Sequence, residues 1–311
     1  MKSSKQVDFN HLIPPFCNPY LMAFARVLSY FRAMHPPAST YTIENSCPFG
    51  NEAFSPEKTK DVLETYNREG CVRIPQVFSP DEVAALKMAV DRVFAGRCPE
   101  KATSFSGEYI AMRLFEWDNI FRDLLVREPI ISLMEAIFGA DCHLIANNVV
   151  RNRPGEAIST YHVDERLMYP LPDNVARYDR RQTFPMHLLN VQMPLTDVEA
   201  DEYGPTQYVP ESHFSGRQPN DRFDPVWEGR HGVSVLCKAG DIYFQHGQVW
   251  HRGAPNTSNR TRYLLQMAFA SRMISQRFFP FLNYRMPGHV LEGAGERLLR
   301  VLGKHPAGPY G

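Results

Sequence analysis

The sequence predicts an α+β fold in which helices come first and the second half of the chain is an all-β sandwich or barrel. Two observations support this prediction. Helical patterns with recognisable caps occupy residues 56–139, and short strand-like segments separated by turns follow Gly139. No internal repeat or low-complexity tract interrupts this order. Helices followed by strands are typical of an α+β chain whose β half closes on itself.

The first half contains four predicted helices and one short strand. Ser79 at the N-cap and Pro80 at the first helical position give the third helix a strong start, and Gly70 is suited to end the second. Arg26 and Arg32 interrupt the first, which we therefore expect to be amphipathic rather than membrane-spanning. In chain order the segments are PYLMAFARVLSYFRAM, EKTKDVLETYNREG, the strand CVRIPQVF, EVAALKMAVDRVFAG and FRDLLVREPIISLMEAIFG.

The second half contains the predicted strands. Near its end IYFQHGQVWH is expected to form one long strand, GAPNTSN a loop, and RTRYLLQMAF the returning strand. One short helix and a Gly/Pro-rich tail are expected after them. The strand candidates are HLIANNVVRN, STYHVDE, MHLLNVQMPL, QYVPES, VSVLCKAGDIYFQHG and RYLLQMAFASR.

Composition excludes several classes of function. The formal net charge is zero without a long run of one sign, so neither nucleic acid nor an anionic membrane is expected as the main partner. The six cysteines are scattered without a CxxC pair, which favours a reduced protein over a disulfide scaffold or a zinc site. The first residues lack the apolar stretch of a secretory signal. We expect a cytoplasmic protein without a membrane span.

The segment YHVDERL holds the first candidate site. Residues two apart in a strand point to the same face, so His162 and Asp164 project together. A histidine from another strand would complete a two-His-one-carboxylate set, which suits non-haem Fe(II); His246 and His251 both compete for this role. An HxD pair alone is weak evidence, because on the order of every second chain of this size has one by chance. The pair fits equally well a strand edge with a salt bridge to Arg166.

The order of several motifs resembles that of the phytanoyl-CoA dioxygenase-like family of Fe(II)/2-oxoglutarate-dependent oxygenases. The similarity runs from about residue 59 to about residue 272, or roughly two thirds of the chain. It implies a double-stranded β-helix (jelly-roll, cupin-like) core with flanking N-terminal helices, within one domain over residues 1–311. The motifs are REGCVRIPQVFSPDEVAALKMAVDRV, YHVDE, VQMPLTDVEADEYGPTQYVPESH and GDIYFQHGQVWHRGAPNTSNRTRYLL. The expected layers are a mostly helical one at 1–139, the core at 140–275 and a C-terminal extension at 276–311.

The resemblance also implies which residues bind the cofactors. Iron would be bound by His162, Asp164 and His251, since the family takes its third ligand from the histidine that opens the HxG(x)PN loop, and His246 would not be a ligand. Arg262 would bind the distal carboxylate of 2-oxoglutarate, for which the planar guanidinium supplies two parallel donors.

A polar side chain on the strand before the HxD is also expected to reach the cosubstrate. We assign this role to Asn147; its neighbour Asn148, which faces the other way, stays open as the alternative. In the long segment after the HxD, Arg166 and Tyr169 are the candidate substrate contacts, together with the pair Arg180–Arg181. A solvated charge cluster is the alternative interpretation of these residues.

The implied reaction consumes O2 and 2-oxoglutarate, yields succinate and CO2, and oxidises a small organic molecule, most often by hydroxylation. Related halogenases have a small residue at the carboxylate position, so Asp164 disfavours halide transfer. Desaturation, epoxidation and endoperoxide formation use the same ligands and stay open. A catalytically silent jelly-roll binding protein is the alternative from another class, and the complete ligand set argues against it.

Overall fold

The computed structural model describes residues 40–96, 110–164, 170–183, 186–278 and 284–307. They all belong to one compact unit, Ser39–Gly311. The amphipathic helix expected before residue 35 lies outside the described residues, as do Arg166 and Tyr169. None of the helices within the described ranges is both long and apolar enough to cross a membrane.

Two antiparallel sheets form the β core. The large sheet has the strand order β1-β8-β5-β10-β3-β2 and the small sheet the order β4-β9-β6-β7. The strands of the large sheet are β1 (Cys71–Ile74), β2 (Ile110–Met112), β3 (His143–Asn152), β5 (Leu189–Pro194), β8 (Ile242–His246) and β10 (Arg262–Ala270). Those of the small sheet are β4 (Ile158–His162), β6 (Thr206–Tyr208), β7 (Val233–Ser234) and β9 (His251–Gly253). Non-consecutive neighbours in both sheets agree with the predicted jelly-roll.

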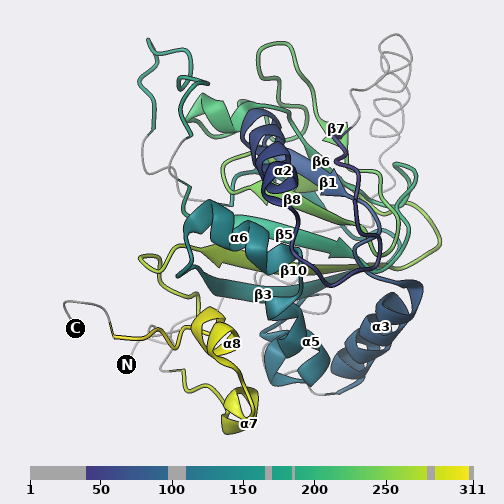
Figure 1. The fold of residues 1–311 in the computed structure, drawn as a ribbon. Coiled ribbons are helices and arrows are strands. Elements are labelled where there is room, and N and C mark those ends of the chain that lie inside the picture. Colours follow the sequence, from purple (N-terminus) through teal and green to yellow (C-terminus); the bar gives the residue numbers. More distant parts are fainter. Residues whose placement is uncertain (1–39, 97–109, 165–169, 184–185, 279–283, 308–311) are drawn as a thin grey trace, which may run out of the picture. The chain divides into compact units, whose positions relative to one another are not determined.

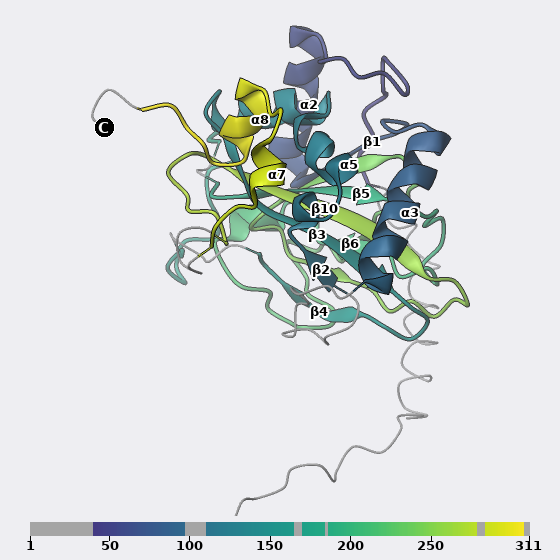
Figure 2. The same ribbon diagram turned by 90° about the horizontal axis from the view of Figure 1, so that it is seen from below.

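Helices cover the outer face of the large sheet, as Figure 1 shows for α2, α5 and α6. In the turned view of Figure 2, α2 and α5 lie on one side of β10, and β4 lies on the other. The main helices are α2 (Pro56–Glu69), α3 (Pro80–Ala95), α5 (Asn119–Asp123) and α6 (Ile130–Phe138), with α7 (Gly288–Leu291) and α8 (Glu296–Val301) near the C-terminal end. Short 3-10 turns are η1 (Leu114–Glu116), η2 (Leu124–Val126) and η3 (Ser212–Ser215).

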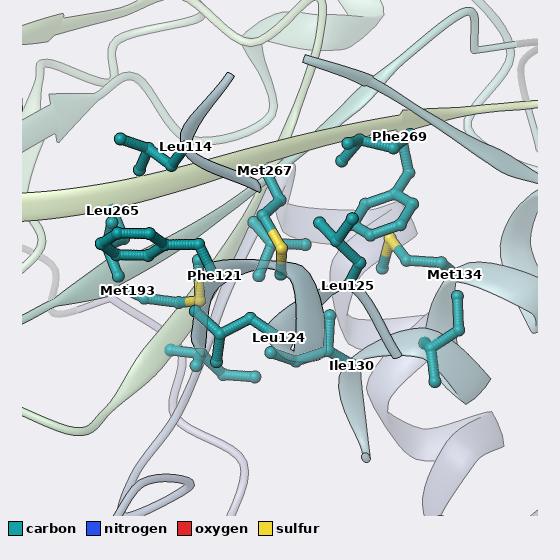
Figure 3. Packing of buried hydrophobic residues seen from close by; sticks show 14 of the residues in the cluster. Leu114, Phe121, Leu124, Leu125, Ile130, Met134, Met193, Leu265, Met267 and Phe269 are labelled. Atoms are coloured by element: carbon teal, nitrogen blue, oxygen red, sulfur yellow. The ribbon is translucent and has the colours of Figure 1, made fainter. Parts of the chain in front are cut away.

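The alternation of side chains along β10 separates the main core from the interior between the sheets. Leu265, Met267 and Phe269 point outward and are buried against the helices, where Phe121 and Met134 meet them (Figure 3). The intervening positions of the same strand point toward the small sheet. The register of β10 sets which side chains face the helices and which face the small sheet. A slip by one residue would therefore place the polar side chains of the interior in the helical core.

Local signals fix the helix ends where the sequence predicts them. At α3 the Ser79 hydroxyl accepts a hydrogen bond from the Glu82 amide, and the Glu82 carboxylate accepts one from the Ser79 amide, so the predicted cap is confirmed as a complete capping box. At the end of α2, Gly70 has φ of 79°, a left-handed conformation that favours glycine.

Two predicted elements are broken in the structure. The single helix expected through FRDLLVREPIISLMEAIFG is divided into α5, η2 and α6, because Pro129 has no amide hydrogen to donate and restricts the residue before it. The long strand expected from Ile242 to His251 is divided into β8 and β9 by a turn, in which Val249 N donates to His246 O at 3.0 Å. This second break moves His251 into the small sheet.

Candidate active site

Two of the predicted metal ligands face each other across a strand pair. His162 ends β4 and His251 begins β9, and these two residues are direct partners in the antiparallel register. Their ring centroids are 4.3 Å apart. The break in the predicted long strand therefore has a structural role, because it brings His251 to β4.

Asp164 completes the cluster from just beyond the strand. β4 ends at His162, and the amide of Asp164 donates to the carbonyl oxygen of Gly247, in the turn after β8, at 3.0 Å. The Asp164 carboxylate lies 3.6 Å from His162 Nε2 through Oδ1 and 3.4 Å from His251 Nε2 through Oδ2. One possible ligand atom from each of the three residues lies within 4.8 Å of those of the other two.

Backbone contacts set the ring orientation of both histidines. His162 Nδ1 lies 3.0 Å from the carbonyl oxygen of Thr160, and His251 Nδ1 lies 2.9 Å from that of Val249. A carbonyl oxygen can only accept, so Nδ1 carries the proton in each neutral ring and Nε2 keeps its lone pair. Metal-binding histidines are held in this way, and the residues present thus fit a divalent metal.

The electrostatics of the cluster agree with a cation site. Burial alone would raise the pKa of the Asp164 carboxyl, but His251 and His162 hold this pKa far below its ordinary value. Burial opposes protonation of His162, yet hydrogen bonding and charge attraction from Asp164 raise its pKa above the ordinary value. The carboxylate is therefore ionised, and a metal ion can supply the positive charge that it attracts.

The other candidate histidine lies on the far side of the large sheet. His246 points outward from β8, is buried, and stacks on Tyr66 with ring centroids 5.9 Å apart. Its Nδ1 accepts a hydrogen bond from the Gln248 amide at 3.1 Å, and burial holds its pKa well below the ordinary value. This side chain is a neutral core residue that the strand alternation separates from His251.

Arg262 lies in the interior of the β core, where a cosubstrate anchor was predicted. Its side chain is buried and donates to the carbonyl oxygen of Gly204 and, at 3.5 Å, to Thr206 Oγ1. The hydroxyl groups of Thr206 and Tyr243 are 2.9 Å apart. Burial lowers the pKa of Arg262, although the guanidinium remains charged. Within the described residues no carboxylate pairs with this cation, so an anionic ligand would compensate it.

One cavity of about 220 Å³ joins the three-residue cluster to Arg262. Because His162, Asp164 and His251 line the same space as Arg262, a small dicarboxylate can reach both. The remaining lining residues are Ile110, Met112, Asn148, Val150, Asn152, Ile158, Asn190, Gln192, Thr206, Gln245, Arg252, Gly253, Leu264, Gln266 and Arg277.

The register of β3 does not support the assignment of Asn147 to the cosubstrate. The side chain of Asn147 faces the helical layer, where its Oδ1 accepts from the Phe115 amide at 3.2 Å and its Nδ2 donates to Gln266 O at 3.4 Å. Asn148, its neighbour, lines the cavity instead. Of the two positions that the sequence left open, Asn148 and not Asn147 lines the cavity. Two adjacent asparagines give no alternation from which the inward face can be read.

The arginine pair expected to meet the substrate is occupied by acids. Arg180 forms ion pairs with Glu211 and with Glu228, and Arg181 contacts Asp179. These guanidinium groups are therefore compensated and belong to a charged cluster outside the cavity described above.

Several carboxamides of the cavity escaped the sequence analysis. Gln266 and Gln192 are paired across β10 and β5, and Gln266 Nε2 donates to Gln192 Oε1 at 2.9 Å. Asn190 and Gln245 are partners across β5 and β8. In the segment LNVQM every second residue is polar, which is unusual for a strand buried on both faces. This pattern could have indicated that the strand lines a polar cavity.

The sequence is similar to those of known dioxygenases. A family model described as "Phytanoyl-CoA dioxygenase (PhyH)" matches residues 66–264, which is more than half of the chain. The multifunctional dioxygenase prhA of Penicillium brasilianum is 26% identical over 242 residues, which cover 73% of this chain and 75% of that protein.

Solved structures share the fold. The non-heme alpha ketoglutarate dependent carbocyclase SnoK from nogalamycin biosynthesis matches with a TM-score of 0.53 and 24% identity, over 73% of this chain and 88% of SnoK. The epimerase SnoN in complex with Fe3+, alpha ketoglutarate and nogalamycin RO matches with a TM-score of 0.55 and 21% identity, over 78% of this chain and 93% of SnoN. The chain therefore belongs to the phytanoyl-CoA dioxygenase (PhyH) family and is an Fe(II)- and 2-oxoglutarate-dependent dioxygenase.

Proposed function

We propose that His162, Asp164 and His251 are the iron ligands and that Arg262 binds the distal carboxylate of 2-oxoglutarate. The observation that carries this proposal is a single cavity lined both by the three-residue cluster and by a buried, uncompensated guanidinium. Two imidazoles and one carboxylate leave open coordination positions, which is the arrangement that non-haem Fe(II) oxygenases use. When bound, the metal and cosubstrate supply oxidising power from O2 with release of succinate and CO2.

The protein's own residues orient the reaction partners. The carbonyl oxygens of Thr160 and Val249 keep both Nε2 atoms directed at the metal position. Arg262, with Thr206 beside it, fixes the distal end of the dicarboxylate. The 2-oxo end of the dicarboxylate is then directed toward Asp164.

The proposed reaction is oxidation of a small organic molecule of secondary metabolism, with hydroxylation as the main outcome. The chain has an aspartate, Asp164, at the position where related halogenases have a small residue, which favours oxygen transfer over halogenation. The similarity to prhA, a multifunctional dioxygenase, and to SnoK and SnoN, both from nogalamycin biosynthesis, supports a metabolite of this kind as substrate.

A second outcome is supported by a specific observation. The two structural relatives carry the names carbocyclase and epimerase, so the same fold and ligand type serve reactions that form a bond or invert a centre. Desaturation, epoxidation or endoperoxide formation on the same site is therefore the alternative to hydroxylation. Mass analysis of the product separates hydroxylation, which adds one oxygen atom, from desaturation, which removes two hydrogens, and from endoperoxide formation, which adds two oxygen atoms. Epoxidation also adds one oxygen atom, so NMR of the product is needed to distinguish it from hydroxylation.

The experiment that tests the proposal begins with anaerobic binding. Addition of Fe(II) and 2-oxoglutarate to the purified protein is expected to produce a weak visible charge-transfer band. A metabolite screen that monitors succinate release then identifies the substrate. A wild-type protein that gives neither the band nor succinate with any candidate would contradict the function and would favour a silent binding protein.

Two further assignments remain proposals. Arg166 and Tyr169 follow the metal-binding segment directly in sequence, and we propose them as substrate contacts.

We also propose that the protein works in the cytoplasm, which is supported by unpaired thiols at Cys47, Cys71 and Cys237.

A further inference from the structure

Gln245 carries an unsatisfied carboxamide inside the active-site cavity. The residue has 0% relative exposure, and neither Nε2 nor Oε1 has a hydrogen-bond partner among the described residues. It also lines the cavity that contains the proposed metal ligands. Buried polar groups in native proteins are almost always hydrogen-bonded, so an exception at a binding site indicates a partner that arrives with a ligand.

The position of Gln245 relates it to the metal-binding carboxylate. Gln245 on β8 is the direct cross-strand partner of Asn190 on β5, and the Nδ2 of Asn190 donates to Asp164 Oδ2. Two residues after Gln245, the Gly247 carbonyl accepts from the Asp164 amide at 3.0 Å. The turn that follows the strand of Gln245 therefore holds the backbone of Asp164. Side chains of direct cross-strand partners lie within reach of the same groups.

Other carboxamides in the cavity provide a contrast. Gln192 and Gln266 satisfy each other at 2.9 Å, and Asn190 is bound to Asp164. Cys71 is the partner of Gln245 on its other side, and burial raises the pKa of this thiol, so it remains protonated and is at best a weak hydrogen-bonding partner. The surrounding protein thus leaves the Gln245 amide free for a bound group.

We propose that Gln245 donates a hydrogen bond to an oxygen ligand on the open face of the metal, beside Asp164. This inference rests on the metal site and cosubstrate anchor proposed above. A neutral amide donor favours an anionic oxygen without the desolvation cost of a second buried cation. The oxygen has two sources with the same chemistry, a carboxylate of the 2-oxo acid at its metal-bound end or a metal-bound water. If the oxygen belongs to the 2-oxo acid, Arg262 binds the distal end of the cosubstrate and Gln245 binds its metal-bound end.

The test compares Gln245→Leu with the wild type. Co(II) replaces Fe(II) as an oxygen-stable probe, and titration calorimetry measures binding first of Co(II) alone and then of 2-oxo acids to the Co(II)-loaded protein. The two acids are 2-oxoglutarate and 2-oxobutyrate, which lacks the distal carboxylate that Arg262 would bind. Gln248→Leu is the matched control, because Gln248 is a buried glutamine three residues away that does not line the cavity.

The binding result distinguishes the two sources of the oxygen. If Gln245 contacts the 2-oxo acid, Gln245→Leu weakens both acids by the same factor, about tenfold to a hundredfold for a hydrogen bond to a charged group, and leaves Co(II) affinity unchanged. If it contacts metal-bound water, Co(II) affinity falls before any acid is added. Unchanged binding of Co(II) and of both acids would overturn the inference.

Thermal unfolding of the metal-free protein separates a binding role from a structural one. Leucine in place of an unsatisfied buried amide is expected to leave the melting temperature unchanged or to raise it. A clear decrease would mean that the amide already has a partner in the free protein, which also overturns the inference. If the wild type itself binds neither Co(II) nor 2-oxoglutarate, the proposed function has failed instead, and this outcome is recognised before any variant is compared.

Discussion

Asn190 donates a hydrogen bond from Nδ2 to the Oδ2 atom of Asp164, so a side chain of the large sheet holds the carboxylate that belongs to the ligand cluster of the small sheet. Since His162 and His251 both belong to the small sheet, Asn190 is a link by which the two sheets position the metal site together. Because this hydrogen bond occupies Oδ2 of Asp164, it favours metal binding through Oδ1.

Loss of this contact should loosen the metal site. Asn190→Ala is expected to weaken divalent metal binding by about tenfold to a hundredfold, the range found when groups that orient metal ligands are removed. Anaerobic titration with Co(II) measures the affinity, and the visible spectrum reports the coordination geometry. Gln192→Ala, on the same strand face, serves as the control because it does not contact Asp164. Equal metal affinity for Asn190→Ala and wild type would contradict a positioning role.

The two competing histidines give opposite expectations. His251→Ala is expected to abolish metal binding, because it removes an Nε2 that points into the ligand cluster. His246→Ala is expected to keep metal binding, since His246 faces Tyr66 on the other side of the sheet. It should still cost about 1–3 kcal/mol of stability by truncating a buried side chain. The anaerobic charge-transfer band with 2-oxoglutarate is the readout, and a band lost only in His246→Ala would reassign the ligand.

Removal of the proposed cosubstrate anchor should affect one 2-oxo acid more than another. Arg262→Ala is expected to weaken 2-oxoglutarate by roughly a hundredfold, which corresponds to two charge-assisted hydrogen bonds. 2-Oxobutyrate has no distal carboxylate and should bind the variant and the wild type alike. Arg260→Ala is the control, since this exposed arginine precedes β10 and contacts Tyr203 instead. Equal losses for both acids would show that Arg262 acts on the fold and not on the carboxylate.

Local sequence signals predicted much of the fold because they act over a few residues. The α2 and α3 caps, β3 and β10 follow directly from hydrogen-bonding groups and alternation in the chain. The broken elements could not be read in this way. The turn between β8 and β9 contains Gly247, yet it was missed because apolar residues continue on both sides of it.

The metal cluster could be anticipated, whereas its supporting residues could not. His162, Asp164 and His251 fall in motifs with a recognisable order. Asn190 and Gln245 are ordinary strand residues until the register pairs them, and register is a property of two strands and not of either sequence. The open choice between Asn147 and Asn148 has the same cause, since one residue of register decides between the helical layer and the cavity.

Acid is expected to destabilise the fold through two buried histidines. Burial lowers the pKa of His213 to about 4, against a smaller opposing effect of the Asn67 carbonyl, and burial also holds the pKa of His246 well below its ordinary value. Both rings are therefore neutral when folded, whereas the unfolded chain takes up protons near pH 6.5. Because the unfolded state binds more protons in this window, stability is highest above about pH 6.5 and decreases as the pH falls toward 4.

The size and origin of this acid effect can be measured. Each histidine contributes a slope of up to about 1.4 kcal/mol per pH unit, followed by urea unfolding of the metal-free protein between pH 7.5 and 4.5. His213→Gln keeps a donor for the Asn67 carbonyl and His246→Asn keeps an acceptor for the Gln248 amide, so each variant removes titration while preserving the contact. Both variants should flatten the pH dependence. A wild-type slope that survives in the double variant would assign the acid sensitivity to other groups.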